Sequence, residues 1–251
     1  MIHSFLLVGQ SNMAGRGFPH EVEPIENKRI KVLRNGRWQP MYVPVNADRS
    51  FSGISLAESF ADLYARDHDV DVGLIPCADG GTRISQWAEG GLLFDHALYQ
   101  AELASRTSTI AGVLWHQGEA DSFEDRWPCY PEKLAGVLDA FRRRLELYDV
   151  PFVLGGLGDF LALRDDPGFR SLHYPKINAA IEAYAQTHEM TGFASAEGLE
   201  SNPDHLHFNA KSLRELGRRY YEVFRTLEDP NKVFEEKVHP DLAVRNWMEN
   251  L

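Results

Sequence analysis

The fold is decided by the stretch Phe5-Leu6-Leu7-Val8-Gly9-Gln10-Ser11-Asn12, in which an apolar run ends abruptly at a glycine and three polar residues. A short apolar run that ends at a turn signal is typical of a strand buried on both faces. Further along the chain, such runs alternate with longer segments whose apolar residues have helical spacing. This alternation predicts βαβ units around a mostly parallel sheet.

The remaining elements follow from the same periodicity. We expect further core strands at 70–76, 110–115, 152–157 and 192–194, and helices at 55–68, 93–106, 134–145, 171–186 and from after Phe208 to about 225, the last with Asn209 as its N-cap. Asn35-Gly36 lies between apolar residues and predicts a two-residue hairpin, which we place outside the main sheet.

Length and composition favour one α/β domain. The chain has 251 residues, 43% of them hydrophobic, which is enough to bury a substantial core. We assign residues 1–228 to this domain and 229–251, a polar segment with Pro230 and Pro240, to a C-terminal extension packing on the surface. There is no internal repeat or low-complexity segment.

Charge and cysteine content exclude several classes of function. The formal charge is -11, the pI is about 5.4, and no run of Lys or Arg could follow a phosphate backbone, so we expect neither nucleic acid nor a membrane as partner. A homo-oligomer is left open. Cys77 and Cys129 have no zinc-like spacing and are interpreted as free thiols. The first apolar run is too short for a signal peptide or a membrane span, so the chain as given is expected to be cytoplasmic, or secreted if a signal peptide was removed.

Three polar segments directly follow expected strands, at 9–12, 79–82 and 117–119. In parallel α/β sheets, ligands bind beyond the carboxyl ends of the strands, so these segments are expected to converge on one site. A serine hydroxyl there needs a base to remove its proton. The stretch from Asp204 to His207 supplies an imidazole with a carboxylate three residues before it. Ser11 is therefore a candidate nucleophile.

Each residue also has a plainer interpretation on its own. Ser11 could cap a helix, Gly80 and Gly81 could form an ordinary turn, and Glu119 could cap a helix. A metal-assisted hydrolase is one alternative, with ligands drawn from His116, Glu119, Asp121, Asp204, His205 and His207. A noncatalytic nucleotide- or carbohydrate-binding module is another, prompted by the glycine-rich stretch 9–17, although Arg16 and Gly17 stand where a P-loop needs Lys and Ser or Thr.

Taken together, the segments resemble the SGNH hydrolase superfamily, and within it the acetylxylan esterase and sialate O-acetylesterase-like group, carbohydrate esterase family 6 in particular. The resemblance spans roughly residues 2 to 225 and rests on four motifs: Gly9-Gln10-Ser11-Asn12-Met13-Ala14-Gly15, Gly80-Gly81-Thr82-Arg83-Ile84-Ser85-Gln86-Trp87, Trp115-His116-Gln117-Gly118-Glu119-Ala120-Asp121 and Asp204-His205-Leu206-His207-Phe208. It implies a three-layer α/β/α sandwich with a central parallel sheet of about five strands, flavodoxin-like, that removes acetyl groups from sugars without a cofactor or metal.

By position, the resemblance implies Ser11 as nucleophile, His207 as base and Asp204 as the acid that orients it, with Glu119 as a competing partner of the histidine. The N–H groups of Ser11 and Gly81, with the side-chain amide of Gln117, would form the oxyanion hole. Gln10, Asn12 and Trp87, from the same motifs, are expected to contact the oxyanion or the substrate. Trp87, Trp38 and Trp127 are candidates for a wall on which a sugar stacks.

Overall fold

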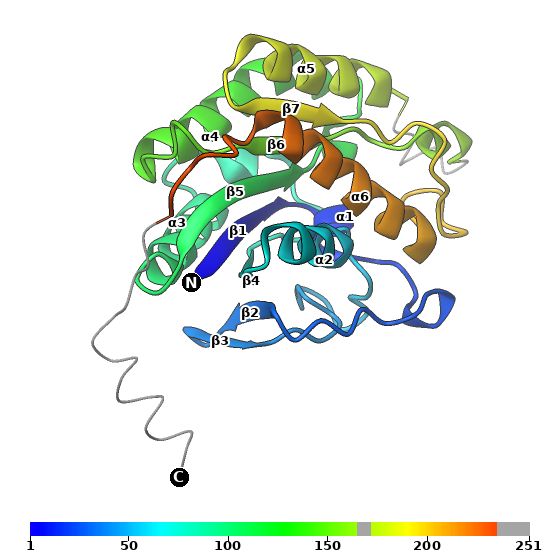
Figure 1. Ribbon diagram of the computed structural model, residues 1–251. Coiled ribbons are helices and arrows are strands. Elements are labelled where there is room, and N and C mark those ends of the chain that lie inside the picture. The colour runs from blue at the N-terminus through cyan, green and yellow to red at the C-terminus, as the bar shows by residue number, and fades with distance from the viewer. Residues whose placement is uncertain (165–171, 235–251) are drawn as a thin grey trace.

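The computed structural model describes residues 1–164 and 172–234, which build a seven-stranded sheet between two layers of helices (Figure 1). The strand order is β3-β2-β4-β1-β5-β6-β7, and all neighbouring strands are parallel except β2 and β3. The strands are β1 (Ile2–Gly9), β2 (Ile30–Arg34), β3 (Arg37–Pro40), β4 (Asp71–Pro76), β5 (Thr109–His116), β6 (Phe152–Gly155) and β7 (Thr191–Ala194).

The predicted flavodoxin-like arrangement is confirmed for the inner part of the sheet. Along the chain, β1, β4, β5, β6 and β7 are the five expected core strands, and their spatial order β4-β1-β5-β6-β7 corresponds to the flavodoxin order 2-1-3-4-5. The order reverses between β1 and β5, so the crevice beyond the carboxyl ends of these two strands is the expected place for a ligand.

The hairpin, in contrast, does not lie outside the sheet. Asn35 and Gly36 form its turn with φ of 51° and 69°, the left-handed conformation that such turns require. However, β2 pairs in parallel with β4 and extends the sheet by two strands. The reason is burial: Ile30 and Val32 alternate toward the core and are fully covered, so the hairpin gains more by joining the sheet than by standing apart from it.

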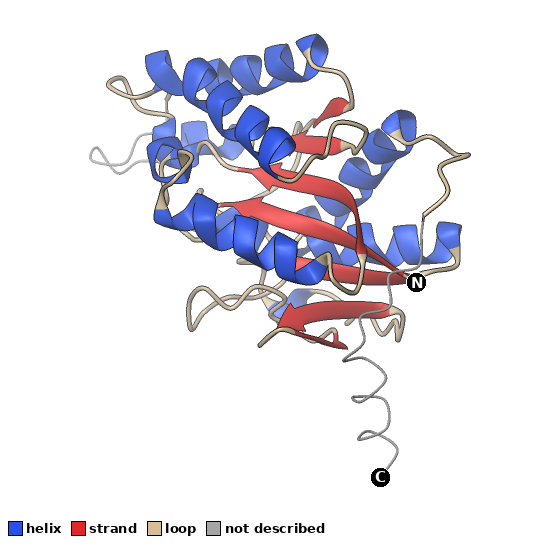
Figure 2. Cartoon of the chain, turned by 90° about the vertical axis from the view of Figure 1, so that its left-hand side faces the viewer, coloured by secondary structure: helices blue, strands red, loops and turns tan. Residues whose placement is uncertain are grey.

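The helices form one layer on each face of the sheet (Figures 1 and 2). One layer contains α2 (Ala57–His68) and α6 (Ala210–Leu227), which pack against each other, and the other contains α3 (Leu92–Ala104), α4 (Tyr130–Arg144) and α5 (Tyr174–Thr187). Asn209 caps α6 as predicted, since its Oδ1 accepts a hydrogen bond from the Ser212 N–H at 2.8 Å. The expected helix at 171–186 begins at Tyr174, and residue 171 lies outside the described residues.

Short helical segments connect these elements, many of them at the carboxyl end of the sheet. They are α1 (Ser11–Ala14) and the 3-10 helices η1 (Pro19–Glu21), η2 (Ile84–Trp87), η3 (Glu119–Asp121), η4 (Trp127–Cys129) and η5 (Asp159–Leu163).

Aromatic side chains fill both interfaces between sheet and helices. On one face, Phe5 of β1 packs edge-on against Phe60 of α2 and Phe224 of α6, with ring centroids 4.9 and 5.6 Å apart. On the other, Phe94 of α3 stacks on Phe141 of α4 at 4.4 Å. All five rings are at most 2% exposed, and each contributes roughly 1.5–3 kcal/mol by its burial. The core thus fixes β1, and with it the residues that follow.

Both cysteines are free, as predicted, with Cys77 buried and Cys129 exposed. The described part of the C-terminal extension lies along the molecule: the Lys232 ammonium donates to Asp149, and the Phe234 ring lies 4.0 Å from that of His3. Residues 235–251 lie outside the described residues. Among the helices that are described, none has the length and apolar character needed to cross a membrane.

Candidate active site

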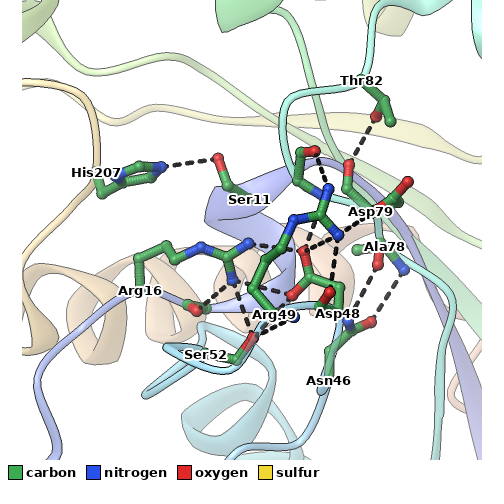
Figure 3. Close-up of polar contacts among 12 residues, drawn as sticks. Ser11, Arg16, Asn46, Asp48, Arg49, Ser52, Ala78, Asp79, Thr82 and His207 are labelled. Carbon is green, nitrogen blue, oxygen red and sulfur yellow. Dashed lines mark hydrogen bonds and ion pairs between the residues drawn. The ribbon is translucent and has the colours of Figure 1, made fainter.

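The side chains of Ser11, His207 and Asp204 form a continuous hydrogen-bonded chain. Ser11 Oγ lies 3.0 Å from His207 Nε2, and His207 Nδ1 lies 2.6 Å from Asp204 Oδ2. Figure 3 shows the imidazole directed at the serine hydroxyl. The serine lies directly beyond β1, while the other two residues come from the loop that precedes α6. The fold thus joins residues that are 196 positions apart.

A sharp turn at the end of β1 presents Ser11. Gly9 has φ +133°, and a Cβ at this position would lie 2.1 Å from the carbonyl oxygen of His116. No other residue could bring the end of β1 so close to β5. The chain then turns away from the sheet into α1, and the Ser11 side chain faces a pocket instead of the core.

The turn around His207 is organised by Asp204. Its Oδ1 accepts the backbone N–H groups of Leu206 and His207, both at 3.0 Å, which leaves Oδ2 for the imidazole. Burial would raise the pKa of Asp204, but the hydrogen bonds from the His207 ring and the two N–H groups outweigh it and hold that pKa well below the ordinary carboxyl value. The Asp204 carboxyl group is therefore ionised at neutral and mildly acidic pH.

Asn12 links the nucleophile to the base from the opposite side. Its Nδ2 donates to the Leu206 carbonyl at 3.2 Å, and its Oδ1 accepts the Phe208 N–H at 3.1 Å, so it holds both neighbours of His207. Because Asn12 also follows Ser11 directly in the chain, one side chain sets the relative position of nucleophile and base. Instead of contacting the pocket, for which it was predicted, Asn12 is 1% exposed and supports the site from beneath.

Glu119 belongs to this support. Its Oε1 accepts from Asn12 Nδ2 at 2.5 Å and lies 3.4 Å from His116 Nε2, while His116 Nδ1 contacts the Tyr220 hydroxyl. Burial opposes ionisation of Glu119, but the interactions with His116 and Asn12 outweigh it, so its pKa is lower than usual. Of the two carboxylates predicted to compete for His207, Asp204 makes the contact and Glu119 reaches the histidine loop only through Asn12.

The glycine-rich loop after β4 lies beside Ser11 and is braced by the segment 46–52 (Figure 3). Asp48 Oδ2 accepts the Gly80 N–H at 2.8 Å and Arg49 donates to the Gly80 carbonyl at 2.9 Å. Asp48 itself is held by a buried ion pair with Arg16 at 2.7 Å. The next residue, Gly81, has φ +79°. Its N–H has no hydrogen-bond acceptor within the described ranges, so this group can donate to a bound ligand.

Gln117 does not reach the pocket, contrary to its expected role in the oxyanion hole. It is fully buried, and its Nε2 already lies within hydrogen-bond distance of Asp121, Thr82 and Gln10. The side chain follows the last residue of β5 into the interior, where the carboxylate of Asp121 attracts its amide. Gln10, in contrast, lines the pocket beside Ser11.

The pocket has a volume of about 480 Å³ and a cationic lining. Besides Ser11, His207, Gly81, Gln10 and parts of neighbouring loops, its wall contains Arg16, Arg49, Arg83, Arg126, Arg164, Phe51 and Phe123. None of these arginines or phenylalanines was predicted from the sequence. They stand singly on separate loops, and the only available signal was their proximity to the motifs, most directly for Arg16 and Arg83, which lie next to or within them.

The expected tryptophan wall is wrong. Trp87 is fully buried, packs edge-on against Trp115 at 5.6 Å and donates its Nε1–H to Thr82. Trp38 lies on β3 at the sheet edge, and Trp127 stacks on His173, both away from the pocket lining. The aromatic surface beside Ser11 comes from Phe51, which is 68% exposed, and from Phe123.

The residues of the metal-assisted alternative are divided between two places. His116 and Asp121 lie in the buried layer, and Glu119 lies in the same layer with one edge at the pocket wall. His207 lines the pocket from the loop before α6, and Asp204 contacts it there. Over residues 1–164 and 172–234, no three His, Cys, Asp or Glu side chains come together in an arrangement that could hold a metal ion.

Comparison with known proteins agrees with this geometry. Residues 1–226 match the family model described as carbohydrate esterase, sialic acid-specific acetylesterase. The chain belongs to this family. The esterase is therefore a carboxylic ester hydrolase, which replaces the alternative of a noncatalytic module.

Individual relatives share the fold over most of the chain. The esterase is 25% identical over 237 residues to Probable carbohydrate esterase At4g34215 of Arabidopsis thaliana, covering 85% of this chain and 86% of that protein. The solved structure of the Arabidopsis protein superposes with a TM-score of 0.78, at 24% identity over 89% of this chain and 98% of that one. A carbohydrate acetylesterase from Xanthomonas citri gives a TM-score of 0.64 at 18% identity, covering 90% of this chain and 56% of that one.

Proposed function

We propose that the esterase removes O-acetyl groups from carbohydrates through a covalent acyl-enzyme formed on Ser11. The observation that carries this proposal is the unbroken contact from Ser11 Oγ through the His207 ring to the Asp204 carboxylate. An imidazole that donates from Nδ1 to a carboxylate presents a free lone pair at Nε2, which is what removal of the serine proton requires.

The reaction takes place in two steps. Ser11 Oγ attacks the acetyl carbonyl carbon and gives its proton to His207 Nε2, while Asp204 stabilises the resulting imidazolium. The negative charge on the carbonyl oxygen is stabilised by the N–H groups of Ser11 and Gly81, neither of which has an acceptor in the described residues. The sugar hydroxyl leaves with the proton from His207, and water then releases acetate by the same path.

The pocket lining favours an acidic sugar over neutral acetylated xylan. Among the described residues, five arginines and one carboxylate side chain, that of Glu119, line the pocket of a protein whose net charge is -11. Arg16 is neutralised by Asp48 and Arg49 contacts Asp79, but the exposed Arg83 has no acidic partner within 4.0 Å among the described residues. A guanidinium in this position suits the carboxylate of a sialic acid-type substrate.

The mechanism is tested with p-nitrophenyl acetate and Ser11→Ala. We expect this variant to keep the wild-type thermal midpoint and to lose at least about 10³-fold in kcat, because the attacking atom is gone. A serine-directed organophosphonate should label the wild type once, at Ser11, and abolish its activity. Near-normal turnover by Ser11→Ala would refute the acyl-enzyme.

The substrate class is tested by comparing kcat/KM for O-acetylated sialic acids and acetylated xylo-oligosaccharides. We expect the wild type to prefer the acidic sugar and Arg83→Gln to lose about tenfold of that preference, roughly one charge-assisted hydrogen bond. Arg106→Gln is the matched control, because Arg106 is also exposed but does not line the pocket. A wild type that prefers the neutral oligosaccharide would overturn this assignment.

A further inference from the structure

Arg49 is an arginine of the pocket wall that the mechanism above leaves without a role. It lies outside the four sequence motifs, on the segment that precedes α2, and its side chain is 42% exposed. Three acceptors of the protein nevertheless hold its guanidinium (Figure 3). Nη1 donates to the Asp48 carbonyl at 2.7 Å and to Asp79 Oδ1 at 2.8 Å, and Nη2 donates to the Gly80 carbonyl at 2.9 Å. The guanidinium is thus bound within the protein at both of its terminal nitrogens.

The Gly80 carbonyl belongs to the same peptide group as the Gly81 N–H. This peptide bond is trans, so its C=O and its N–H point in opposite directions in one plane. A hydrogen bond from Arg49 to the oxygen therefore sets the direction of the N–H. That N–H has no acceptor in the part of the chain that the structure describes, and Gly81 lines the pocket together with Ser11.

The preceding peptide group of the loop is fixed as well. The Gly80 N–H donates to Asp48 Oδ2 at 2.8 Å, and Asp48 is held in turn by the buried Arg16. A Cβ on Gly80 would lie 2.5 Å from Arg16 Nη2 and 3.5 Å from Ser11 Cβ, so the loop packs against this ion pair and against the nucleophile. Adjacent residues of one segment, 48 and 49, therefore hold Gly80 at its N–H and at its C=O.

The charge of Arg49 has a second effect on this peptide group. A cation that donates to a carbonyl oxygen forms a strong hydrogen bond and draws electron density from the peptide nitrogen, which makes the N–H at the other end a better donor. Asp79 binds the guanidinium at Nη1, whereas the Gly80 carbonyl is bound to Nη2. Arg49 can therefore strengthen the Gly81 N–H as a donor without contacting the substrate.

We propose that Arg49 is a positioning residue that orients and polarises the peptide group between Gly80 and Gly81 for donation to the oxyanion. This inference rests on the proposed function, since it concerns the tetrahedral intermediate. As the bond from Ser11 Oγ to the carbonyl carbon forms, the serine proton moves to His207 Nε2 and the electron pair of the C=O bond moves to the oxygen. That oxygen accepts the Gly81 N–H, while Arg49 stays on the other side of the peptide group.

The test compares Arg49→Met, Arg49→Lys and Arg29→Met in the full chain. Arg49→Met removes the charge and the donors at similar length, whereas Arg49→Lys keeps a cation that can donate to the Gly80 carbonyl. Arg29 is the matched control, because its side chain is 45% exposed and pairs with Asp69 at 2.7 Å but does not line the pocket.

Three quantities are measured for each variant: kcat and KM with p-nitrophenyl acetate, the affinity for trifluoroacetone, and the thermal midpoint. Trifluoroacetone adds to Ser11 Oγ and forms a tetrahedral oxyanion, so its affinity reports stabilisation of that charge. Both compounds are neutral, and a role of Arg49 in binding an acidic sugar would therefore leave these readouts unchanged.

We expect Arg49→Met to lose about 10–50-fold in kcat and a similar factor in trifluoroacetone affinity, with less than about a threefold change in KM. The loss is smaller than the ~10²–10³-fold typical of deleting an oxyanion donor, because the Gly81 N–H itself remains. Arg49→Lys should stay within about fivefold of the wild type, and Arg29→Met should match it. Should Arg49→Met fail to fold, Arg49→Gln takes its place, since it also removes the charge.

Three results would overturn the inference. They are a kcat of Arg49→Met that falls by less than about tenfold, a fall in kcat without a matching fall in trifluoroacetone affinity, and an Arg49→Lys variant no better than Arg49→Met. Any of them, obtained while Ser11→Ala is inactive, leaves the esterase mechanism intact. Ester hydrolysis that persists in Ser11→Ala would instead remove the proposed function and this inference with it.

Discussion

Replacing Asp204 by asparagine should inactivate the esterase by reversing the His207 tautomer. Asp204 Oδ1 accepts two backbone N–H groups, from Leu206 and His207. In Asp204→Asn the carbonyl oxygen of the new amide must remain on these donors, so its NH₂ points at His207 Nδ1. The ring must then accept at Nδ1 and carry its proton on Nε2, where it can no longer take the proton of Ser11.

The size of this effect follows from the exposure of the carboxylate. A comparable change in a buried triad lowers kcat by about 10⁴-fold. The Asp204 side chain is 47% exposed, so water can partly replace its interactions, and we expect about 10³-fold, or roughly 4 kcal/mol of barrier. The assay is kcat with p-nitrophenyl acetate across pH, together with the thermal midpoint, which should change little because both backbone hydrogen bonds remain.

Glu119→Gln is the matched control. Its Oε1 can still accept from Asn12, and it has no contact with His207, so kcat should fall by less than about tenfold. The reasoning is refuted if Glu119→Gln is the inactive variant and Asp204→Asn retains near-normal turnover, because the acid partner of the histidine would then be Glu119.

Three further outcomes concern stability. Asp48→Ala leaves the buried Arg16 guanidinium unpaired and should cost about 3–5 kcal/mol in urea unfolding, and a cost below about 1 kcal/mol would contradict the role of this pair. Burial alone would raise the pKa of Asp48, but its bonds to Arg16, Ser52 and Gly80 have the larger effect, so the pKa in the folded protein lies below the ordinary 3.8. The free energy of unfolding of the wild type should therefore fall as the pH drops below about 4, and Asp48→Asn should flatten this part of the plot of unfolding free energy against pH. Gly9→Ala should cost at least about 1–3 kcal/mol of unfolding free energy for its backbone conformation alone and should displace Ser11. Gly136→Ala, on an open face of α4, should instead stabilise the protein by roughly 0.5–1 kcal/mol. Equal urea midpoints for the two variants would contradict this reasoning.

Much of the fold could be predicted because the inner strands are apolar on both faces. The runs in β1, β4 and β5 stand out without any partner, and the polar residues after them mark the carboxyl edge of the sheet. The hairpin at 30–40 was misplaced because β2 has only five residues, with polar Lys31 and Arg34 among its apolar ones, and such a short pattern does not distinguish a strand that joins the sheet from one in a separate ribbon.

The site was predicted where a motif fixes a residue and missed where tertiary contacts decide. The nearness of Ser11, Asp204 and His207 follows from the motifs, and the structure brings the three together. The direction of a side-chain amide, in contrast, does not follow from a motif. Gln117 turns inward because its amide binds Asp121, whereas the amide of Gln10 is held by the N–H groups of residues 118 and 120, and these contacts depend on the tertiary structure. Likewise, Trp87 lies in a motif yet turns inward to Trp115, while the pocket arginines come from separate loops.

The central place of β1 has a consequence for biosynthesis. This strand precedes both of its neighbours, β4 and β5, along the chain, so a ribosome that has not passed residue 116 carries an apolar segment with an unpaired edge. The base arrives later still, in the loop before α6. A nascent chain therefore needs protection of β1 from aggregation early, and it gains hydrolytic activity only when α6 docks with the loop that precedes it. Recovery of activity during refolding thus reports the docking of α6.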